Sequence, residues 1–298
     1  MVLVTGGTGF IGSRVLKKLI DDGFDVAATA RESTDFSRVQ DIRERVLWVG
    51  AGADELQEFF VKNKVDAVVH MATSYGRKRE QFFDVYETNV SFALNLMKMA
   101  AENGCRLFVN TDSFSVNELG DCLQVGVDVH MNAYHKSKFM FREIARDNIS
   151  MLDMAFANMQ LQHIYGPGDC GGKFVLFMMN ELSKETPEIE LTEGLQQRDW
   201  TYVDDAASAY SAVLKNMDGF KPGSFNEFQV GTGVATSLRD FCIKLKDAMN
   251  SSSELCFGRK EMQRGELMTA KADNASLKAL GWEIEVDLDE GIRRLIQK

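Results

Sequence analysis

The chain has 298 residues, enough to bury the core of one large domain or of two closely packed ones. Its composition is that of an ordinary soluble α/β protein, and its net charge of −10 argues against nucleic acid as a partner. The apolar runs are too short to span a bilayer and no signal peptide precedes the first strand, so we expect no membrane partner and a cytoplasmic location. The five scattered cysteines form no CxxC pair, which predicts reduced thiols and no metal site.

The N-terminal residues predict a strand, a glycine-rich turn and a helix. The apolar residues 1–4 are followed by Thr-Gly-Gly-Thr-Gly-Phe-Ile-Gly at 5–12 and by a helical pattern over 13–22. This order is typical of a dinucleotide-binding βαβ unit, in which the helix N-terminus holds phosphates. Gly6 would permit the tight turn, Gly9 the approach of a pyrophosphate, and Gly12 close packing of the helix. The predicted cofactor-binding residues of this turn are Gly6, Gly9, Phe10, Ile11 and Gly12, and a glycine-rich turn that binds nothing is the alternative.

Short apolar runs then alternate with helical patterns, which predicts a parallel sheet. We predict strands over 1–4, 25–29, 47–49, 67–71, 106–110 and 152–159, with helices over 13–22, 54–62, 81–103 and 134–147. The fold class is therefore α/β, a Rossmann-type doubly wound parallel sheet of at least six strands. After a turn at 165–168 the rhythm changes, and helices over 174–182 and 238–249 suggest a smaller C-terminal substrate-binding lobe. We predict that 1–165, with about 199–217, form the NADP-binding domain, and that 166–198 and 218–298 form the interleaved lobe.

The end of the second strand indicates which cofactor is used. An acidic residue there accepts hydrogen bonds from the adenine ribose, whereas an arginine accommodates a 2′-phosphate. Here the strand ends in Ala30-Arg31-Glu32, and the planar cation of Arg31 suits a phosphate. We predict NADP(H) as the cofactor, with NAD(H) left open. Glu32 could instead pair with Arg31 or bind a ribose, and Arg31 could be a solvated surface arginine.

Tyr134 and Lys138 form a Tyr-x-x-x-Lys pair at the start of a predicted helix. Residues four apart lie on the same helix face. A nearby ammonium favours the phenolate and lowers the pKa of a tyrosine from its reference value near 10. The pair can then move a proton to or from a sugar oxygen while a nicotinamide moves hydride. A surface pair is the alternative, which the glycine-rich turn upstream disfavours.

With these motifs the chain resembles the extended short-chain dehydrogenase/reductase family, in its nucleotide-sugar epimerase/dehydratase/reductase branch. The resemblance covers nearly the full length and rests on residues 5–12, 66–72, 89–90, 134–138, 165–168 and 198–205. It implies that the Thr111 hydroxyl hydrogen-bonds the reacting oxygen and that Lys138 also holds the nicotinamide ribose. It implies further that Met71 and Ala72 contact the cofactor and that Asn89 supports the site, although an internal helix cap is the alternative for Asn89.

On the substrate side, the resemblance implies that Arg198 grips the diphosphate of a nucleotide sugar, as a bidentate arginine can. A salt bridge with Asp199 or Asp204 is the alternative for Arg198. Arg264 resembles a second diphosphate arginine. Further expected substrate-binding residues are Thr73, Ser113 and His163. A buried core histidine is the alternative for His163, and Gln160 stands where an arginine is frequent.

The residues after the fifth strand bear on the reaction. Dehydratases that resemble this chain carry Thr-Asp-Glu there, whereas this chain has Thr111-Asp112-Ser113. Ser113 cannot abstract a carbon-bound proton, so dehydration is disfavoured, and we expect Asp112 to cap a turn. Arg31 indicates an exchangeable NADPH and hence a net reduction.

We predict an NAD(P)-dependent oxidoreductase of surface-polysaccharide biosynthesis, such as that of lipopolysaccharide. Its reaction would be the reduction of the C4 ketone of a CDP- or dTDP-linked 4-keto-6-deoxyhexose. An NAD-dependent 4-epimerase is the alternative, and a non-catalytic NADP-sensing regulator is a second one. A homodimer is expected through helices 81–103 and 134–147, whose phenylalanines at 82, 83, 139 and 141 could equally be core.

Overall fold

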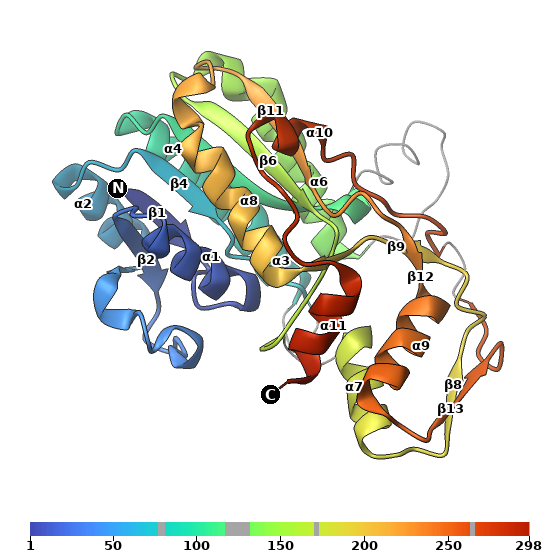
Figure 1. The fold of residues 1–298 in the computed structure, drawn as a ribbon. Coiled ribbons are helices and arrows are strands. Elements are labelled where there is room, and N and C mark those ends of the chain that lie inside the picture. The colour runs from blue at the N-terminus through green and yellow to red at the C-terminus, as the bar shows by residue number, and fades with distance from the viewer. Residues whose placement is uncertain (77–80, 117–131, 170–172, 263–265, 298) are drawn as a thin grey trace. The chain divides into compact units, whose positions relative to one another are not determined.

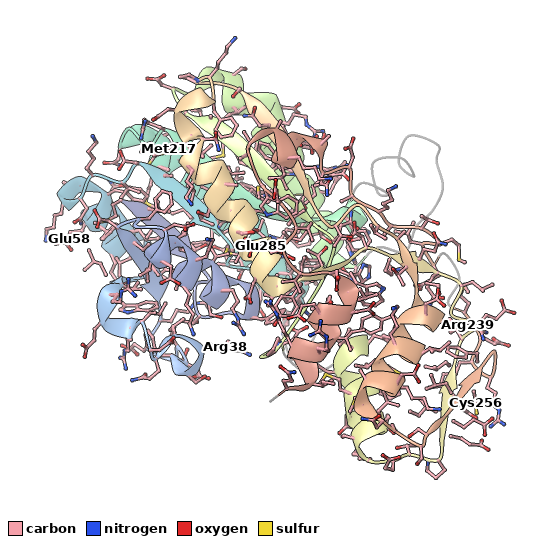
Figure 2. The ribbon with its side chains drawn as sticks, viewed as in Figure 1. Arg38, Glu58, Met217, Arg239, Cys256 and Glu285 are labelled. Atoms are coloured by element: carbon pink, nitrogen blue, oxygen red, sulfur yellow. The ribbon has the colours of Figure 1, made fainter. Side chains whose placement is uncertain are left out.

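A computed structural model describes residues 1–76, 81–116, 132–169, 173–262 and 266–297 (Figure 1). The chain divides into two compact units. The first unit comprises residues 1–161, 207–229 and 276–282, and the second comprises 162–206, 230–275 and 283–298. Charged side chains project from the surface helices, as Glu58 does (Figure 2).

A seven-stranded sheet organises the first unit. Its order is β11-β6-β5-β4-β1-β2-β3, and the pairings from β3 across to β6 are parallel. The strands are β1 (Val2–Thr5), β2 (Val26–Ala30), β3 (Leu47–Gly50), β4 (Ala67–His70), β5 (Leu107–Ser113), β6 (Ala155–Leu161) and β11 (Phe225–Val230). Because β1 lies between β2 and β4, the strand order reverses beside β1, where such sheets bind ligands. The predicted α/β fold class is confirmed.

Helices cover both faces of this sheet. The helices are α1 (Phe10–Asp21), α2 (Ala53–Lys62), α3 (Phe82–Tyr86), α4 (Phe92–Glu102), α6 (Ala133–Asn148) and α8 (Val203–Lys215), with the short α10 (Ala275–Ala279). Turns of 3₁₀ helix occur at Ser37–Val39, Arg43–Arg45, Phe114–Val116, Ile149–Met151 and Met217–Gly219. On one face α1 lies beside α8, where Asp22 after α1 accepts hydrogen bonds from Ser211 and Lys215 of α8 (Figure 1).

Aromatic side chains fill the core on the other face, beneath α6. The rings of Phe108, Phe156 and Phe225 stack in sequence across β5, β6 and β11, with centroids 5.6 Å and 5.1 Å apart. Phe141 of α6 packs edge-on against Phe108 and is 1% exposed. Phe141 is therefore a core residue and not an interface residue. This packing fixes the orientation of α6, which carries the predicted Tyr-x-x-x-Lys pair.

The predicted helix over 81–103 is interrupted. Residues Glu87–Ser91 form one turn of π-helix between α3 and α4. A π-turn holds an extra residue, and such turns often mark functional sites. Asn89 lies within this turn and is 1% exposed.

The described residues of the second unit form helices and short strand pairs. The helices are α7 (Phe174–Ser183), α9 (Leu238–Met249) and α11 (Leu288–Ile296). The pairs are β7 (His163–Tyr165) with β10 (Trp200–Tyr202), β9 (Gln197–Arg198) with β12 (Thr236–Ser237), and β8 (Glu188–Leu191) with β13 (Glu254–Phe257). The rings of Trp200 and Phe241 stack at 4.0 Å within its core. The buried Asp199 carboxylate accepts hydrogen bonds from the backbone N–H groups of Thr232, Gly233 and Ala272, so it ties two loops together.

The units differ from the predicted domain boundaries at residues 162–165, 199–206, 218–229 and 276–282. Residues 218–229 join the first unit because they include most of β11, which extends the sheet beside β6. Residues 276–282 join it because Trp282 donates a hydrogen bond to Ser208 of α8. The assignment of the units to cofactor and substrate remains a prediction.

Candidate active site

The glycine-rich turn packs against the residues that follow β4. Gly6 has a φ of +69°, and a Cβ there would lie 2.7 Å from the backbone N of Ala72. The Thr5 hydroxyl accepts hydrogen bonds from the N–H groups of Met71 and Ala72, both at 3.2 Å. These contacts hold the two loops at the carboxyl ends of β1 and β4 together. Glycine is required at position 6 both for its backbone conformation and for this close approach.

The next two glycines of the motif have different surroundings. A Cβ at Gly12 would lie only 2.2 Å from the carbonyl oxygen of Gly6, so α1 can begin this close to the turn only with glycine there. Gly9 is exposed at the N-cap of α1, whose first turn has no acidic residue, whereas Phe10 is buried and Ile11 half-buried. The exposed helix N-terminus carries a partial positive charge, which fits the pyrophosphate of a dinucleotide.

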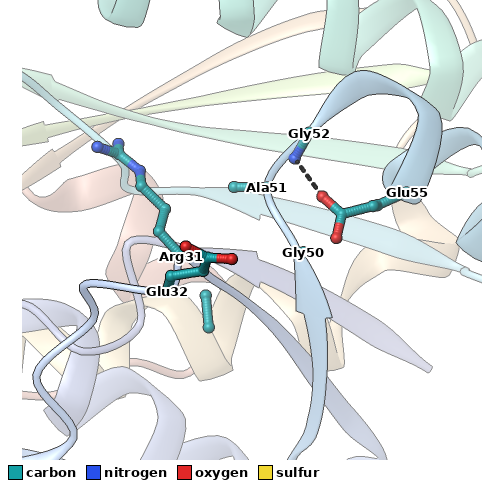
Figure 3. A pocket seen from close by; sticks show the side chains of 7 residues that line it. Arg31, Glu32, Gly50, Ala51, Gly52 and Glu55 are labelled. Carbon is teal, nitrogen blue, oxygen red and sulfur yellow. Dashed lines mark hydrogen bonds between the residues drawn. The ribbon is translucent and has the colours of Figure 1, made fainter.

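A pocket of about 430 Å³ opens at the ends of β2 and β3. It is lined by Ala30, Arg31, Glu32, Gly50, Ala51, Gly52 and Glu55 (Figure 3). The Glu55 carboxylate accepts a hydrogen bond from the Gly52 N–H at 3.1 Å. Within the described residues no ion pair joins Arg31 to Glu32, and Figure 3 shows the guanidinium turned away from that carboxylate. The pocket therefore presents the exposed cation of Arg31 and the exposed carboxylates of Glu32 and Glu55. A cation suits a phosphate, and a carboxylate suits a ribose.

Lys138 reaches from α6 to the end of β5. Its Nζ donates a hydrogen bond of 2.8 Å to the backbone carbonyl of Thr111, and the residue is only 3% exposed. Burial lowers the pKa of Lys138 to about 8. Tyr134, one helical turn earlier on α6, is half-buried, and its ring stacks on Tyr75 with centroids 4.8 Å apart. The structure thus brings the predicted lysine to the predicted threonine and places the tyrosine on the same helix.

Strand alternation separates Asp112 from its neighbours. Thr111 and Ser113 are half-buried, whereas Asp112 is buried, as expected for side chains on opposite faces of β5. The Asp112 carboxylate accepts a hydrogen bond from Asn158 at 3.0 Å and lies 3.6 Å from the Arg142 guanidinium. Burial raises the pKa of Asp112. The residue lies inside the strand, which corrects the predicted turn cap, and its carboxylate is engaged in the interior.

Asn89 links the loop after β4 to α6. Its side-chain oxygen accepts hydrogen bonds from Thr73 and from the Ser74 N–H, and its amide donates to the Ser74 carbonyl and to the Ser137 hydroxyl. The Ser137 hydroxyl donates in turn to the Tyr134 carbonyl at 2.8 Å. Asn89 therefore supports the backbone that carries Tyr134 and does more than cap a helix.

Arg198 and His163 lie in the second unit. Arg198 is 6% exposed, and its guanidinium pairs with Glu266 at 2.5 Å and donates to the Leu267 carbonyl. Among the described residues, the carboxylate that pairs with Arg198 is that of Glu266. His163 packs edge-on against Trp200, and burial with the nearby Arg198 charge lowers the pKa of His163 to about 3. The imidazole is therefore neutral at neutral pH.

The remaining predicted substrate residues differ in what they contact. The Ser113 hydroxyl lies 2.9 Å from that of Ser115, and Gln160 donates to the Glu227 carboxylate at 2.9 Å. Arg264 lies outside the described residues.

Cys105, Cys242 and Cys256 are free thiols, and in the described part of the chain no group of three or more metal-ligating side chains is found. None of the helices in that part combines the length and hydropathy needed to cross a membrane.

Known proteins resemble this chain over most of its length. The model of the NAD-dependent epimerase/dehydratase family matches residues 2–231. CDP-abequose synthase of Salmonella typhimurium is 34% identical over 100% of this chain and 97% of its own length, and that of Salmonella muenchen is 29% identical over 99% and 96%. The chain belongs to the NAD-dependent epimerase/dehydratase family. Its predicted membership, its being an enzyme and its use of a nicotinamide dinucleotide are thereby confirmed.

Solved structures show the same fold. The UDP-glucose 4-epimerase of Thermotoga maritima is 21% identical, with a TM-score of 0.81 over 99% of this chain and 97% of that one. The enzyme of the same name from Stenotrophomonas maltophila is 20% identical, with a TM-score of 0.84 over 99% and 96%. At these identities the likeness concerns the architecture alone.

Three residues around this family's Tyr-x-x-x-Lys pair were not predicted from the sequence. Tyr75 stacks on Tyr134, Ser137 joins Asn89 to α6, and Tyr210 of α8 donates a hydrogen bond to the Thr111 hydroxyl at 2.8 Å. Ser137 lies inside the motif itself, so its position could have been noticed. Tyr75 and Tyr210 belong to no motif, and only the fold brings them to these partners.

Proposed function

We propose that this enzyme reduces the C4 ketone of a nucleotide-diphosphate 4-keto-6-deoxyhexose with NADPH. The observation that carries the proposal is the contact of Lys138 with the end of β5 beside Thr111, from the helix that also carries Tyr134. This arrangement suits proton transfer to an oxygen. The buried pairing of Asp112 argues against dehydration. Similarity to two CDP-abequose synthases over nearly the full length favours a CDP-linked sugar over a dTDP-linked one.

The proposed roles follow from the chemistry of the side chains. The cofactor supplies hydride when bound. The Thr111 hydroxyl donates a hydrogen bond to the ketone oxygen, and Tyr134 transfers its phenolic proton to the alkoxide that forms at C4. The Lys138 ammonium favours the phenolate that remains and so assists the transfer. Lys138 also binds the nicotinamide ribose in this proposal.

Lys138 gives the reaction a pH dependence. Because burial lowers the pKa of its ammonium to about 8, we expect kcat for ketone reduction to fall as pH rises through that value. The protonated lysine is present below this pH and is lost above it. Steady-state rates from about pH 6 to about pH 10 measure this limb. In the Lys138→Arg variant the cation stays charged, so persistence of the limb near pH 8 would assign it to another group.

The proposed cofactor site consists of the glycine turn with Phe10 and Ile11, the Met71-Ala72 segment, and the pocket at Arg31. The positive end of α1 at the exposed Gly9 and the exposed Arg31 guanidinium fit a dinucleotide with a 2′-phosphate.

Replacing Arg31 by Ala is expected to raise the KM for NADPH about tenfold and to leave that for NADH unchanged, since only the former has the phosphate. Arg45→Ala, another exposed arginine of the first unit, is the matched control. Equal losses with both cofactors would remove the case for NADPH.

On the substrate side we propose that Arg198 and Arg264 bind the diphosphate, and that Thr73, Ser113 and His163 bind the sugar. For Arg198 the diphosphate would replace the carboxylate of Glu266, which now pairs with it. The neutral His163 imidazole can donate one hydrogen bond and accept another. The first unit would accordingly bind the cofactor and supply Thr73 and Ser113, and the second unit would supply Arg198 and His163.

We also propose a cytoplasmic homodimer. Phe82 and Phe83 of α3 are 57% and 65% exposed, and Met140 of α6 is 44% exposed. Exposed apolar side chains of this size favour association with a second copy. Sedimentation equilibrium that gives the mass of one chain would contradict this.

Incubation of the purified enzyme with NADPH and CDP-, dTDP- and GDP-linked 4-keto-6-deoxyhexoses tests the proposal. We expect loss of nicotinamide absorbance with the CDP-linked sugar, and none without a sugar. No oxidation of NADPH or NADH with any of these sugars would end the reductase proposal.

A 4-epimerase is the second candidate, because Glu32 lines the cofactor pocket and could bind the ribose of NAD. This chain also shares the fold of the two UDP-glucose 4-epimerases named above. An epimerase would retain NAD through purification and turn over without added cofactor. A non-catalytic NADP sensor is less well supported, because Tyr134 and Lys138 are both present and Lys138 contacts Thr111.

A further inference from the structure

Tyr210 makes a hydrogen bond that none of the proposed roles uses. It lies on α8, is fully buried, and points its hydroxyl at the Thr111 hydroxyl, 2.8 Å away. Both residues belong to the first unit, although nearly one hundred positions separate them in the chain. Thr111 is the residue to which Lys138 donates through the backbone carbonyl. Two buried donors therefore meet on one residue, one at its side chain and one at its main chain.

The Tyr210 phenol is the donor in this bond and the Thr111 hydroxyl is the acceptor. Burial raises the pKa of the Tyr210 phenol above its usual value, so the phenol stays protonated and can donate. Thr111 Oγ1 accepts this proton with one of its lone pairs. A threonine hydroxyl also carries a single proton of its own, which rotates toward another acceptor. With Tyr210 as donor, the Thr111 proton is left to be given to a different oxygen.

We infer that Tyr210 is a positioning residue, which holds the Thr111 hydroxyl as a donor to the reacting sugar oxygen. The inference rests on the proposed function, because it deepens the role given there to Thr111. Hydrogen bonds in a chain polarise one another, so a proton donated to Thr111 Oγ1 also makes that hydroxyl a stronger donor. Tyr210 would thus act through Thr111 without touching the substrate.

A double-mutant cycle tests this inference in the full-length enzyme. Tyr210→Phe keeps the ring and removes the donor, and Thr111→Val removes the acceptor. We expect kcat to fall about tenfold in Tyr210→Phe and about 100-fold in Thr111→Val. In the double variant we expect no loss beyond that of Thr111→Val, because the phenol then has nothing to position. The KM for NADPH should stay unchanged in Tyr210→Phe.

Tyr165→Phe is the matched control. Tyr165 is likewise a buried tyrosine, 2% exposed, and its hydroxyl donates only a long bond of 3.5 Å to the Leu288 carbonyl. Its removal should leave kcat unchanged. If Tyr210→Phe behaves like this control, or if its loss of kcat adds fully to that of Thr111→Val, the positioning role is wrong.

Thermal unfolding of the same four proteins needs no substrate. Each single variant removes one partner of the bond and leaves the other, the buried Tyr210 or the half-buried Thr111, without it, whereas the double variant removes both. The double variant should therefore lose less stability than the sum of the single ones. Additive losses of stability would overturn the inference whatever the substrate. The cycle could instead show this coupling while the wild-type enzyme turns over neither a 4-keto sugar nor an epimerase substrate. That result would overturn the proposed function and with it the catalytic purpose of the bond.

Discussion

Replacing Tyr134 by Phe is expected to lower kcat about 1,000-fold, with little change in the KM for NADPH or in the thermal midpoint. The substitution removes the proposed proton donor and keeps the ring, which stacks on Tyr75. Because the phenol is half-buried on the first turn of α6, the loss of its hydroxyl leaves the core unchanged. Steady-state NADPH oxidation with a CDP-linked 4-keto sugar measures the effect.

Tyr86→Phe is the matched control for this variant, since Tyr86 is also half-buried in the first unit. Its kcat should equal that of the wild type. A Tyr134→Phe enzyme within a few-fold of wild type would mean that another group supplies the proton. The same variant separates the two classes of function, because a sensor of NADP would keep its response without this hydroxyl.

Replacing Gly12 by Ala is expected to abolish measurable NADPH binding and to destabilise the protein by about 2 kcal/mol or more. A Cβ at Gly12 would lie 2.2 Å from the Gly6 carbonyl oxygen and 3.0 Å from the Gly7 Cα, and both are backbone atoms that no rotamer change can move. Relief therefore requires α1 to move away from the turn, which displaces the N–H groups proposed to hold the pyrophosphate. Calorimetric titration with NADPH and thermal unfolding measure the two effects.

Gly219→Ala provides the comparison. Gly219 ends a 3₁₀ turn with a negative φ, and no atom lies within 4 Å of the position a Cβ would take. Alanine there should leave binding unchanged and stability equal or slightly higher. If Gly12→Ala binds NADPH as tightly as this control, the close approach of α1 to the turn is not what forms the phosphate site.

Local patterns predicted most of the first unit, because strand and helix periods are short-range signals. The runs at 25–29 and 47–49 fall on β2 and β3, and the helix over 134–147 falls on α6. The seventh strand, β11, was not assigned to the sheet, because its residues follow the first part of the second unit in the chain. The residues of one strand do not indicate which strand, distant in the sequence, it will pair with.

The candidate site was predictable to the extent that its residues share an element. Tyr134 and Lys138 are four apart on one helix, so their spacing alone places them together. Asp112 shows the opposite case, since β5 extends through Ser113 and strand alternation turns the carboxylate toward Arg142. Tyr210 reaches Thr111 only because α8 packs on the sheet, which no local pattern reports.

A one-residue deletion in the π-turn at Glu87–Ser91 would distinguish the turn's effect on activity from its effect on the stability of the fold. It is an insertion of a single position into a continuous helix, so shortening the chain there by one residue leaves a plain helical segment of the same direction. If the residue removed is Asn89, the apolar face of α4 would stay in register with α3. The hydrogen bonds that Asn89 makes to Ser74 and Ser137 would be lost. We expect this shortened enzyme to fold and to have a lower kcat. The π-turn would then be a feature that serves activity and not stability.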